Sequence, residues 1–180
     1  MIAALILAQA AIISGKVEST PPKYLADTVV YVKDAPGGAA PKTASMDQKG
    51  MKFIPRIFLA TAGDTVRFLN HDGVDHNVYS PDNEGYNLGM IHQDAGGEYR
   101  FARPGVYTQL CSVHPEMIAW VFVGQNPYSA VVGKDGRFKI EGVPAGTWKV
   151  GVWNPQLKAA DQAVTVAAGK TAETSFAIKR

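Results

Sequence analysis

The chain has 180 residues, 46% of them hydrophobic, so it can bury one large core or two small ones. Its formal net charge is +2, from 18 Lys and Arg against 16 Asp and Glu, and this small excess excludes charge-driven binding to nucleic acid or an anionic membrane. With 18 Gly and 11 Pro between short runs of β-branched and aromatic residues, the composition predicts an all-β protein.

The first ten residues are apolar and end in Ala8-Gln9-Ala10, a small-x-small pattern that is typical of a signal-peptidase site. The stretch has no basic start, and it is too short to span a bilayer, so we expect no membrane span. It predicts a signal-like leader over residues 1–10 and a periplasmic or otherwise exported protein. The alternative to a leader is that this apolar stretch forms a buried first strand of the fold. The single cysteine excludes an intramolecular disulfide.

Short apolar runs along the first two thirds of the chain predict strands. Two of them, at 12–17 and 28–32, precede the segment 34–41, whose Pro, Gly and Ala residues predict a linker or long loop. The later runs are spaced as in a β-sandwich and cover residues 53–60, 64–69, 99–101, 106–111 and 120–123. Residues 80–97 have little periodicity and are predicted to form a long loop with one helical turn at most.

Beyond Asn126-Pro127 the pattern changes to strands joined by Asp135-Gly136 and Pro144-Ala145-Gly146 turns, which predicts a second small β-sandwich. The run DGRFKIEGVPAGTWKVGVW, residues 135–153, resembles the carboxypeptidase-regulatory-like family of prealbumin-type sandwiches. The first strands of that family resemble residues 14–17 and 27–32 of this chain. We therefore expect residues 12–36 and 127–180 to form one sandwich, with residues 43–125 inserted in it. Two sequential domains are the alternative.

The run Cys111-Ser112-Val113-His114-Pro115-Glu116-Met117 places a thiol, an imidazole and a thioether in one loop between two predicted strands. Thiolate and imidazole suit copper or zinc, and a weak thioether favours copper over zinc. A second histidine is needed, and His71, His76 and His92 are available. The alternative is that Cys111 is only a small buried hydrophobic residue, and that His114 and Met117 lie near it by accident.

Residues 45–124 resemble the cupredoxins, in particular their amicyanin and plastocyanin branch. The matching runs are Ala62-Gly63-Asp64-Thr65-Val66-Arg67-Phe68-Leu69-Asn70, Asp75-His76-Asn77-Val78, Pro104-Gly105-Val106-Tyr107 and the run from Cys111 to Met117. The two residues between His114 and Met117 are similar to the short amicyanin loop.

The resemblance implies a Greek-key β-sandwich and one copper ion, cycling between Cu(I) and Cu(II). Its ligands would be His76, Cys111 and His114, with Met117 as the axial ligand. It also implies that the Asn77 amide steadies the ligand loops. His76 fits because it opens a strand after a turn; His71 and His92 stay as competitors, and His92 is the stronger of these two.

Two further features concern the comparison with amicyanins: the residue at position 116 and the surface at which partners would dock. Glu116 stands where amicyanins have an aromatic residue, so its carboxylate could replace or supplement the Met117 thioether. The exposed apolar patch at which partners of this family dock would here be formed by Pro115, Met90 and Ile91.

The resemblance therefore implies a type 1 (blue) copper protein that carries single electrons in an exported electron-transfer chain. We expect an unidentified redox protein as its partner. Four protein ligands leave no open position for a substrate, so we expect no enzyme activity. Two alternatives stay open: a copper-binding or copper-delivery protein without electron transfer, and a structural or interaction module with a vestigial site.

Overall fold

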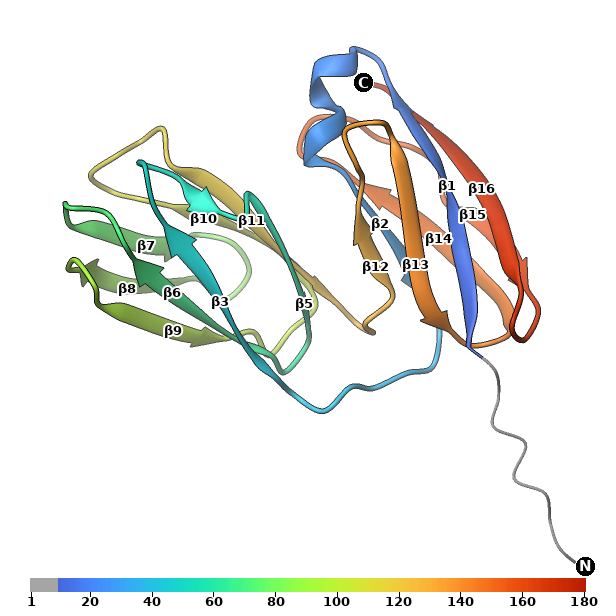
Figure 1. Ribbon diagram of the computed structural model, residues 1–180, viewed down its shortest axis with the longest axis horizontal. Helices are drawn as coiled ribbons and strands as arrows, with labels where there is room; N and C mark the ends of the chain where they lie inside the picture. Colours follow the sequence, from blue (N-terminus) through green and yellow to red (C-terminus); the bar gives the residue numbers. More distant parts are fainter. Residues whose placement is uncertain (1–9) are drawn as a thin grey trace, which may run out of the picture. The chain divides into compact units, whose positions relative to one another are not determined.

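The computed structural model describes residues 10–180, which form two compact units of β-strands (Figure 1). One unit contains residues 38–127, and the other combines residues 10–37 with residues 128–180. The predicted leader lies, apart from Ala10, outside the described residues. Within residues 10–180 the only helical segment is the short 3₁₀ helix η1 (Pro22–Asp27), so the all-β class is confirmed. That described part contains no helix of the length and apolarity that a membrane span requires.

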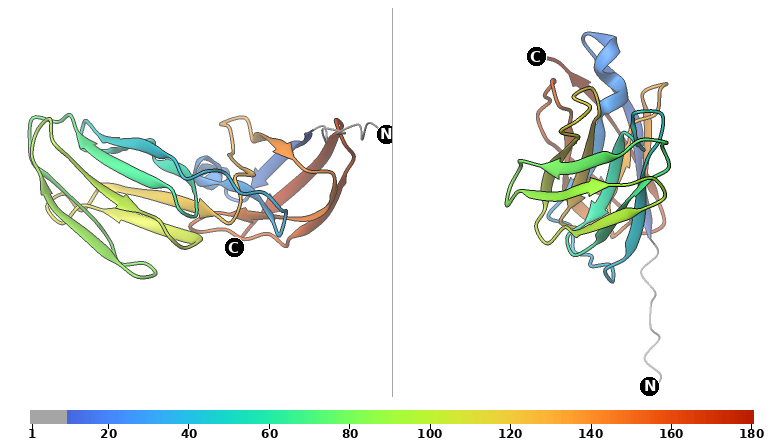
Figure 2. Two further views of the ribbon diagram at one scale, coloured as in Figure 1. Left: turned by 90° about the horizontal axis from the view of Figure 1, so that it is seen from below. Right: turned by 90° about the vertical axis from the view of Figure 1, so that its left-hand side faces the viewer.

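The unit of residues 38–127 is a sandwich of two sheets (Figure 2). One sheet has the strand order β4-β3-β6-β9 and the other has the order β5-β11-β10-β7-β8. The strands are β3 (Thr43–Gln48), β4 (Phe53–Ile54), β5 (Ile57–Thr61), β6 (Thr65–Asn70), β7 (His76–Ser80), β8 (Tyr86–Ile91), β9 (Gly96–Arg100), β10 (Gly105–Leu110) and β11 (Ile118–Gly124). Because the chain changes sheet repeatedly and β3 pairs with β6, and β5 with β11, in parallel, the predicted Greek-key sandwich is confirmed.

Alternating side chains of these strands fill the space between the two sheets. Phe68, Phe101 and Tyr107 are fully buried there, and the rings of Phe101 and Tyr107 meet edge to face with centroids 4.8 Å apart. The same apolar cluster includes Cys111 and Met117. The end of the sandwich that carries the predicted ligands is therefore continuous with its core.

The prediction of a long loop over residues 80–97 is wrong, because β8 and the start of β9 lie there. Both strands are at the edge of their sheets, so each pairs on one side only and exposes many polar side chains. The sequence held one weak sign of these strands, namely the aromatic residues Tyr86 in β8 and Tyr99 in β9. Their stacked rings have centroids 3.9 Å apart and pack on the core.

Two strands also differ from their expected bounds. The predicted strand over residues 53–60 is divided into β4 and β5 around Pro55, which has no amide hydrogen to give to a ladder. The strand β3 was not predicted, because four of its six residues are polar.

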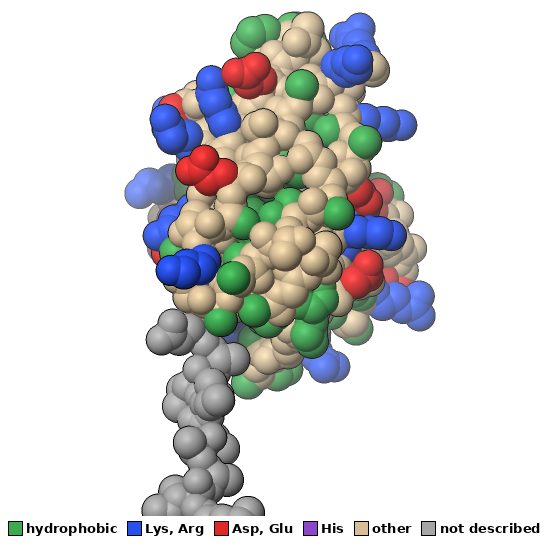
Figure 3. Space-filling view, turned by 90° about the vertical axis from the view of Figure 1, so that its right-hand side faces the viewer, with side chains coloured by type: hydrophobic (Ala, Val, Ile, Leu, Met, Phe, Trp, Pro, Cys, Tyr) green, Lys and Arg blue, Asp and Glu red, His purple; other side chains and the backbone are tan. Residues whose placement is uncertain are grey.

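The second unit is also a small β-sandwich, with sheet orders β13-β1-β16 and β12-β2-β14-β15. Its strands are β1 (Ala11–Ser19), β2 (Val29–Lys33), β12 (Ser129–Val131), β13 (Arg137–Val143), β14 (Gly146–Trp153), β15 (Gln162–Val166) and β16 (Thr171–Ile178). The first strand pairs with β13 in antiparallel and with β16 in parallel. Figure 3, which looks onto this unit, shows Lys and Arg along the flanks of that face with fewer Asp and Glu among them.

Asp64 anchors the turn between β5 and β6. Its buried carboxylate accepts hydrogen bonds from the backbone amides of Lys42 and Thr61, both at 2.9 Å. The side chain therefore joins the first residues of this unit to the start of β6.

We predict that Asp64→Ala lowers the unfolding free energy of the 38–127 unit by about 2–3 kcal/mol, because two amides lose a charged acceptor. Amide hydrogen exchange in β6 and β11 measures this, with β13 and β14 of the same molecule as the reference. Asp94→Asn, at an exposed loop position, is the matched control. Equal exchange in both variants would contradict this role of Asp64.

Candidate metal centre

Three strands of the five-stranded sheet bring the predicted ligands to one end of the sandwich. β7 begins at His76, β10 ends immediately before Cys111, and β11 begins immediately after Met117. In this sheet β10 lies between β11 and β7, and Leu110 pairs with Ile118 on one side and with Tyr79 on the other. The ligand loop is thus closed by a strand pair and held beside the start of β7.

The side chains of His76, Cys111 and His114 converge, with their ligand atoms all within 4.8 Å of one another. The Nδ1 atoms of His76 and His114 are 3.0 Å apart, and the Cys111 Sγ lies 3.7 Å from the His114 Nδ1. His76 and Cys111 are 0% and 3% exposed, while His114 is half-buried. A buried thiol and two imidazoles therefore share one small volume.

These separations fit a single metal ion. Two imidazole nitrogens bound to one ion at roughly 2.0–2.1 Å each lie about 3–4 Å apart, and thiolate bonds are slightly longer. The Nδ1–Nδ1 distance of 3.0 Å and the Sγ–Nδ1 distance of 3.7 Å are of this size, and the third pair of donors lies within 4.8 Å. One thiolate with two imidazoles is also a donor set that suits copper. The residues present therefore fit a copper ion.

Met117 and Glu116 occupy different environments. Met117 is 1% exposed and packs in the same apolar cluster as Cys111, whereas Glu116 is exposed and does not belong to the group of converging ligand atoms. With Met51, both residues line a small cavity. Of the two candidate axial residues, only Met117 is buried in the same apolar cluster as Cys111.

Asn77 connects the two loops that carry the converging residues. Its backbone amide donates to the Cys111 Sγ at 3.4 Å, and its side-chain oxygen accepts from the Ser112 amide at 3.3 Å. Its side-chain amide donates to Asn87 and to the Gly89 carbonyl, both at 2.9 Å. One buried side chain thus fixes the Cys111 loop to β7 and β8.

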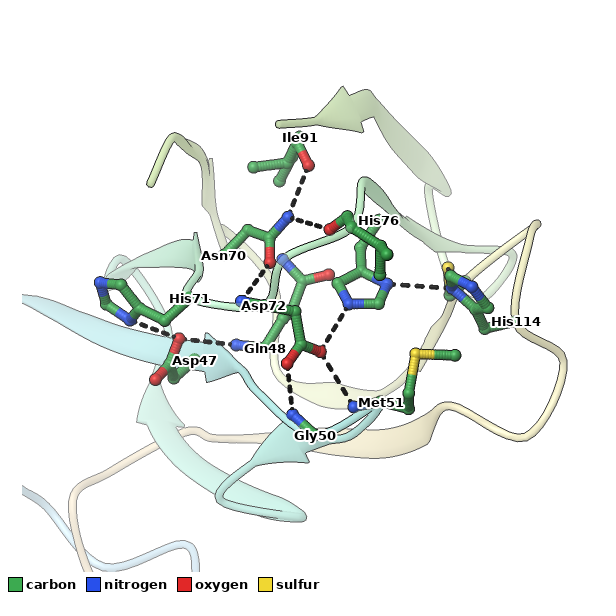
Figure 4. A network of polar contacts seen from close by, with 12 residues as sticks. Asp47, Gln48, Gly50, Met51, Asn70, His71, Asp72, His76, Ile91 and His114 are labelled. Atoms are coloured by element: carbon green, nitrogen blue, oxygen red, sulfur yellow. Dashed lines mark hydrogen bonds and ion pairs between the residues drawn. The ribbon is translucent and has the colours of Figure 1, made fainter. Parts of the chain in front are cut away.

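Asp72 binds the far side of the His76 ring, an interaction that the sequence did not predict. Its Oδ2 lies 2.8 Å from the His76 Nε2, and the backbone amides of Gly50 and Met51 also donate to its carboxylate (Figure 4). Burial raises the pKa of the Asp72 carboxyl, but the bonds from Met51, His76 and Gly50 outweigh it and leave that pKa below its ordinary value. Asp72 is therefore an ionised acceptor at neutral pH.

The two competing histidines lie outside the cluster. His71 is half-exposed, with its Nδ1 2.8 Å from the Asp47 carboxylate. The exposed His92 pairs in the same way with Asp75 at 2.7 Å. Neither ring belongs to the group that contains Cys111.

Exposed apolar side chains lie on the segments around the cluster. Pro115 and Met90 are exposed, as the sequence predicts, but Ile91 is buried in the core, so its assignment to this surface is wrong. Ile91 pairs with His76, and its side chain points into the sandwich instead. Val74 and Val113, which were not predicted, are both exposed on the two ligand loops.

Comparisons with known proteins give partial matches. The family model of polysaccharide lyase family 4, domain II (fn3_3) matches residues 118–174. Among solved structures, the chain is similar to a purple cupredoxin from Nitrosopumilus maritimus, with 26% identity, a TM-score of 0.41 and coverage of 45% of this chain and 99% of that one. A reduced amicyanin mutant has 22% identity and a TM-score of 0.43, with coverage of 52% and 97%.

A copper-containing nitrite reductase (NirK) from Thermus scotoductus SA-01 has 23% identity and a TM-score of 0.44, with coverage of 52% of this chain and 25% of that one. No curated protein matches the sequence. By its Greek-key topology and its His-Cys-His cluster, the unit of residues 38–127 is cupredoxin-like, and the chain adds a second small β-sandwich to it.

We predict that Asn77→Ala lowers the unfolding free energy of the 38–127 unit by about 2–4 kcal/mol, because several buried partners lose their hydrogen bonds together. Hydrogen exchange of the backbone amides in β7 and β10 measures this loss of unfolding free energy. Asn87→Ala removes only one of the partners of Asn77, so its effect should be less than half as large. Equal losses in the two variants would show that Asn77 does not bridge the loops.

Proposed function

We propose that this chain is a type 1 copper protein that carries single electrons. The observation that carries the proposal is the cluster of His76, Cys111 and His114 beside the buried Met117. One thiolate, two imidazoles and a weak thioether are the donor set of blue-copper electron-transfer sites. Copper bound there would supply a one-electron couple that none of the side chains provides.

The protein supports this role by holding the donors in place. The Cys111 loop is closed by the β10–β11 pair and fixed to β7 by Asn77. The Asn77 amide donates to the Cys111 sulfur, which stabilises negative charge on it. Donors that are fixed in this way move little when the charge of a bound ion changes, and a small rearrangement favours fast electron transfer.

His114 is the proposed route for the electron. It is the one member of the converging group that is half-buried, whereas His76 and Cys111 are buried. The exposed Val113 and Pro115 flank it in the loop. We propose that an unidentified redox protein docks on this apolar surface, and that both proteins work in the periplasm or elsewhere outside the cytoplasm.

The same geometry supports a carrier and not an enzyme. With the buried Met117, which shares an apolar cluster with Cys111, as the axial ligand, four protein side chains would surround the ion. A catalytic copper or zinc site keeps one position for substrate or water. This donor set leaves none.

We predict that Cu(II) added to the purified chain binds with a stoichiometry of one and gives an intense visible thiolate-to-copper band and a reversible one-electron wave. Absorption titration and voltammetry measure these properties. Cys111→Ser should lose the band, since the hydroxyl cannot act as the thiolate donor. Retention of the band in this variant would overturn the assignment of Cys111.

The same titration separates the alternative functions. Copper that binds without the band, or that is lost rapidly to a chelator, would indicate a copper-binding or copper-delivery protein. A chain that binds no copper would be a structural or interaction module. Either result would contradict the electron-carrier proposal.

We predict that Met117→Leu raises the reduction potential by about 60 mV or more, a tenfold change in the relative affinity for Cu(II) and Cu(I), because an axial donor is lost. Glu116→Gln should leave the potential and the visible spectrum almost unchanged, because Glu116 is exposed and outside the cluster. Voltammetry of the two copper-loaded variants measures both effects. A larger shift in Glu116→Gln would assign the axial role to the carboxylate.

A further inference from the structure

Three of the four histidines of the chain contact a carboxylate, but only one of these pairs is at the candidate metal site. The pairs are His71 with Asp47, His76 with Asp72 and His92 with Asp75. The His76 ring is 0% exposed and its Asp72 partner is 14% exposed, while the other two pairs are much more exposed. The Asp72–His76 pair is therefore shielded from the water and salt that weaken such interactions at a surface.

The Asp72 carboxylate is fully engaged by three donors. Its Oδ1 accepts from the Gly50 amide, and its Oδ2 accepts from the Met51 amide at 2.9 Å and lies 2.8 Å from the His76 Nε2. Gly50 and Met51 form the turn between β3 and β4, with φ angles of 63° and 57°. Two adjacent amides at this turn therefore point at one carboxylate.

The backbone of Asp72 is fixed as well. Its amide donates to the Asn70 Oδ1 at 2.9 Å, and the Asn70 Nδ2 donates to the carbonyls of Val74 and Ile91 at 2.8 and 2.9 Å (Figure 4). Asn70 is fully buried. The carboxylate thus has little freedom to turn away from His76.

This arrangement sets which nitrogen of His76 carries the proton. An ionised carboxylate only accepts hydrogen bonds, so the His76 Nε2 must carry the proton that it donates to Asp72. The Nδ1, which faces His114 and the cluster, then keeps its lone pair for a metal ion. A carboxylate behind a ligating imidazole also makes the ring a stronger donor.

We infer that Asp72 is a positioning residue of the metal site, which fixes the His76 ring with its Nδ1 free and favours Cu(II) over Cu(I) through its negative charge. This inference rests on the proposed function, because it concerns the same site. The inference extends the proposed function, because Asp72 lies outside the ligand set and yet helps to set the reduction potential.

The substitution Asp72→Asn tests the charge while it keeps the size of the side chain. An asparagine amide has one acceptor oxygen in place of two, so its NH₂ group must face either the turn amides or the His76 Nε2. We expect this variant to weaken Cu(II) binding about tenfold more than Cu(I) binding. For a one-electron couple, such a change raises the reduction potential by about 59 mV.

Asp75→Asn is the matched control. It removes the same charge three residues along the loop, but Asp75 is exposed and pairs with the exposed His92. Its effect on the ratio of Cu(II) to Cu(I) affinity should be about twofold or less, since salt screens exposed charges. Equal potential shifts in the two variants would overturn the inference, because net charge alone would then account for the effect of Asp72.

The nitrogen NMR shifts of His76 in the copper-free protein test the inference independently of copper. In the unaltered chain the His76 proton should lie on Nε2, and Asp72→Asn should lose this preference while His71 and His92 are unchanged. A ring protonated at Nδ1 in the unaltered chain would overturn the inference. Failure of the unaltered chain to bind copper would overturn the proposed function, and the tautomer result would still decide whether Asp72 fixes the ring.

Discussion

The position of β10 between β7 and β11 is the constraint on which the candidate site depends. Strand pairing fixes the end of β10 next to the start of β7, so His76 and Cys111 meet although 34 residues separate them. The β10–β11 pair closes the loop that brings His114 back to the same point. The geometry of the three donors therefore follows from backbone ladders that the apolar core of the sandwich stabilises, and not from contacts among the donors alone.

Burial makes these donors costly to leave without partners. The buried Cys111 thiol and His76 imidazole would destabilise the core unless each found a hydrogen bond or a metal ion. Asn77 and Asp72 supply such partners from opposite sides, one at the sulfur and one behind the His76 ring. The inward-facing nitrogens of His76 and His114 are left facing each other at 3.0 Å, which is the part of the cluster that a cation would stabilise most.

The sequence could predict contacts between residues that are close along the chain better than contacts between distant residues. The donors of the run from Cys111 to Met117 lie in one loop between two apolar runs, so local pattern was enough to propose them together, while His76 needed a family resemblance. Asp72 gave no signal, because an aspartate between Asn70 and Gly73 is what any turn contains. Its contact with His76 is local, four residues along the same loop. The Gly50 turn, whose amides hold the Asp72 carboxylate, lies beside that loop because β3 pairs with β6. Edge strands such as β8 escaped prediction because one-sided pairing relaxes their hydrophobic pattern.

The pairing of β1 also governs the order in which the chain can fold. Ile12 pairs with Thr171 and Ile13 with Ile140, so the second sandwich cannot close until the strands β13 and β16 have left the ribosome. The strands β3 to β11 pair only among themselves and are complete much earlier in synthesis. The unit of residues 38–127 can thus form while β1 still waits for its neighbours.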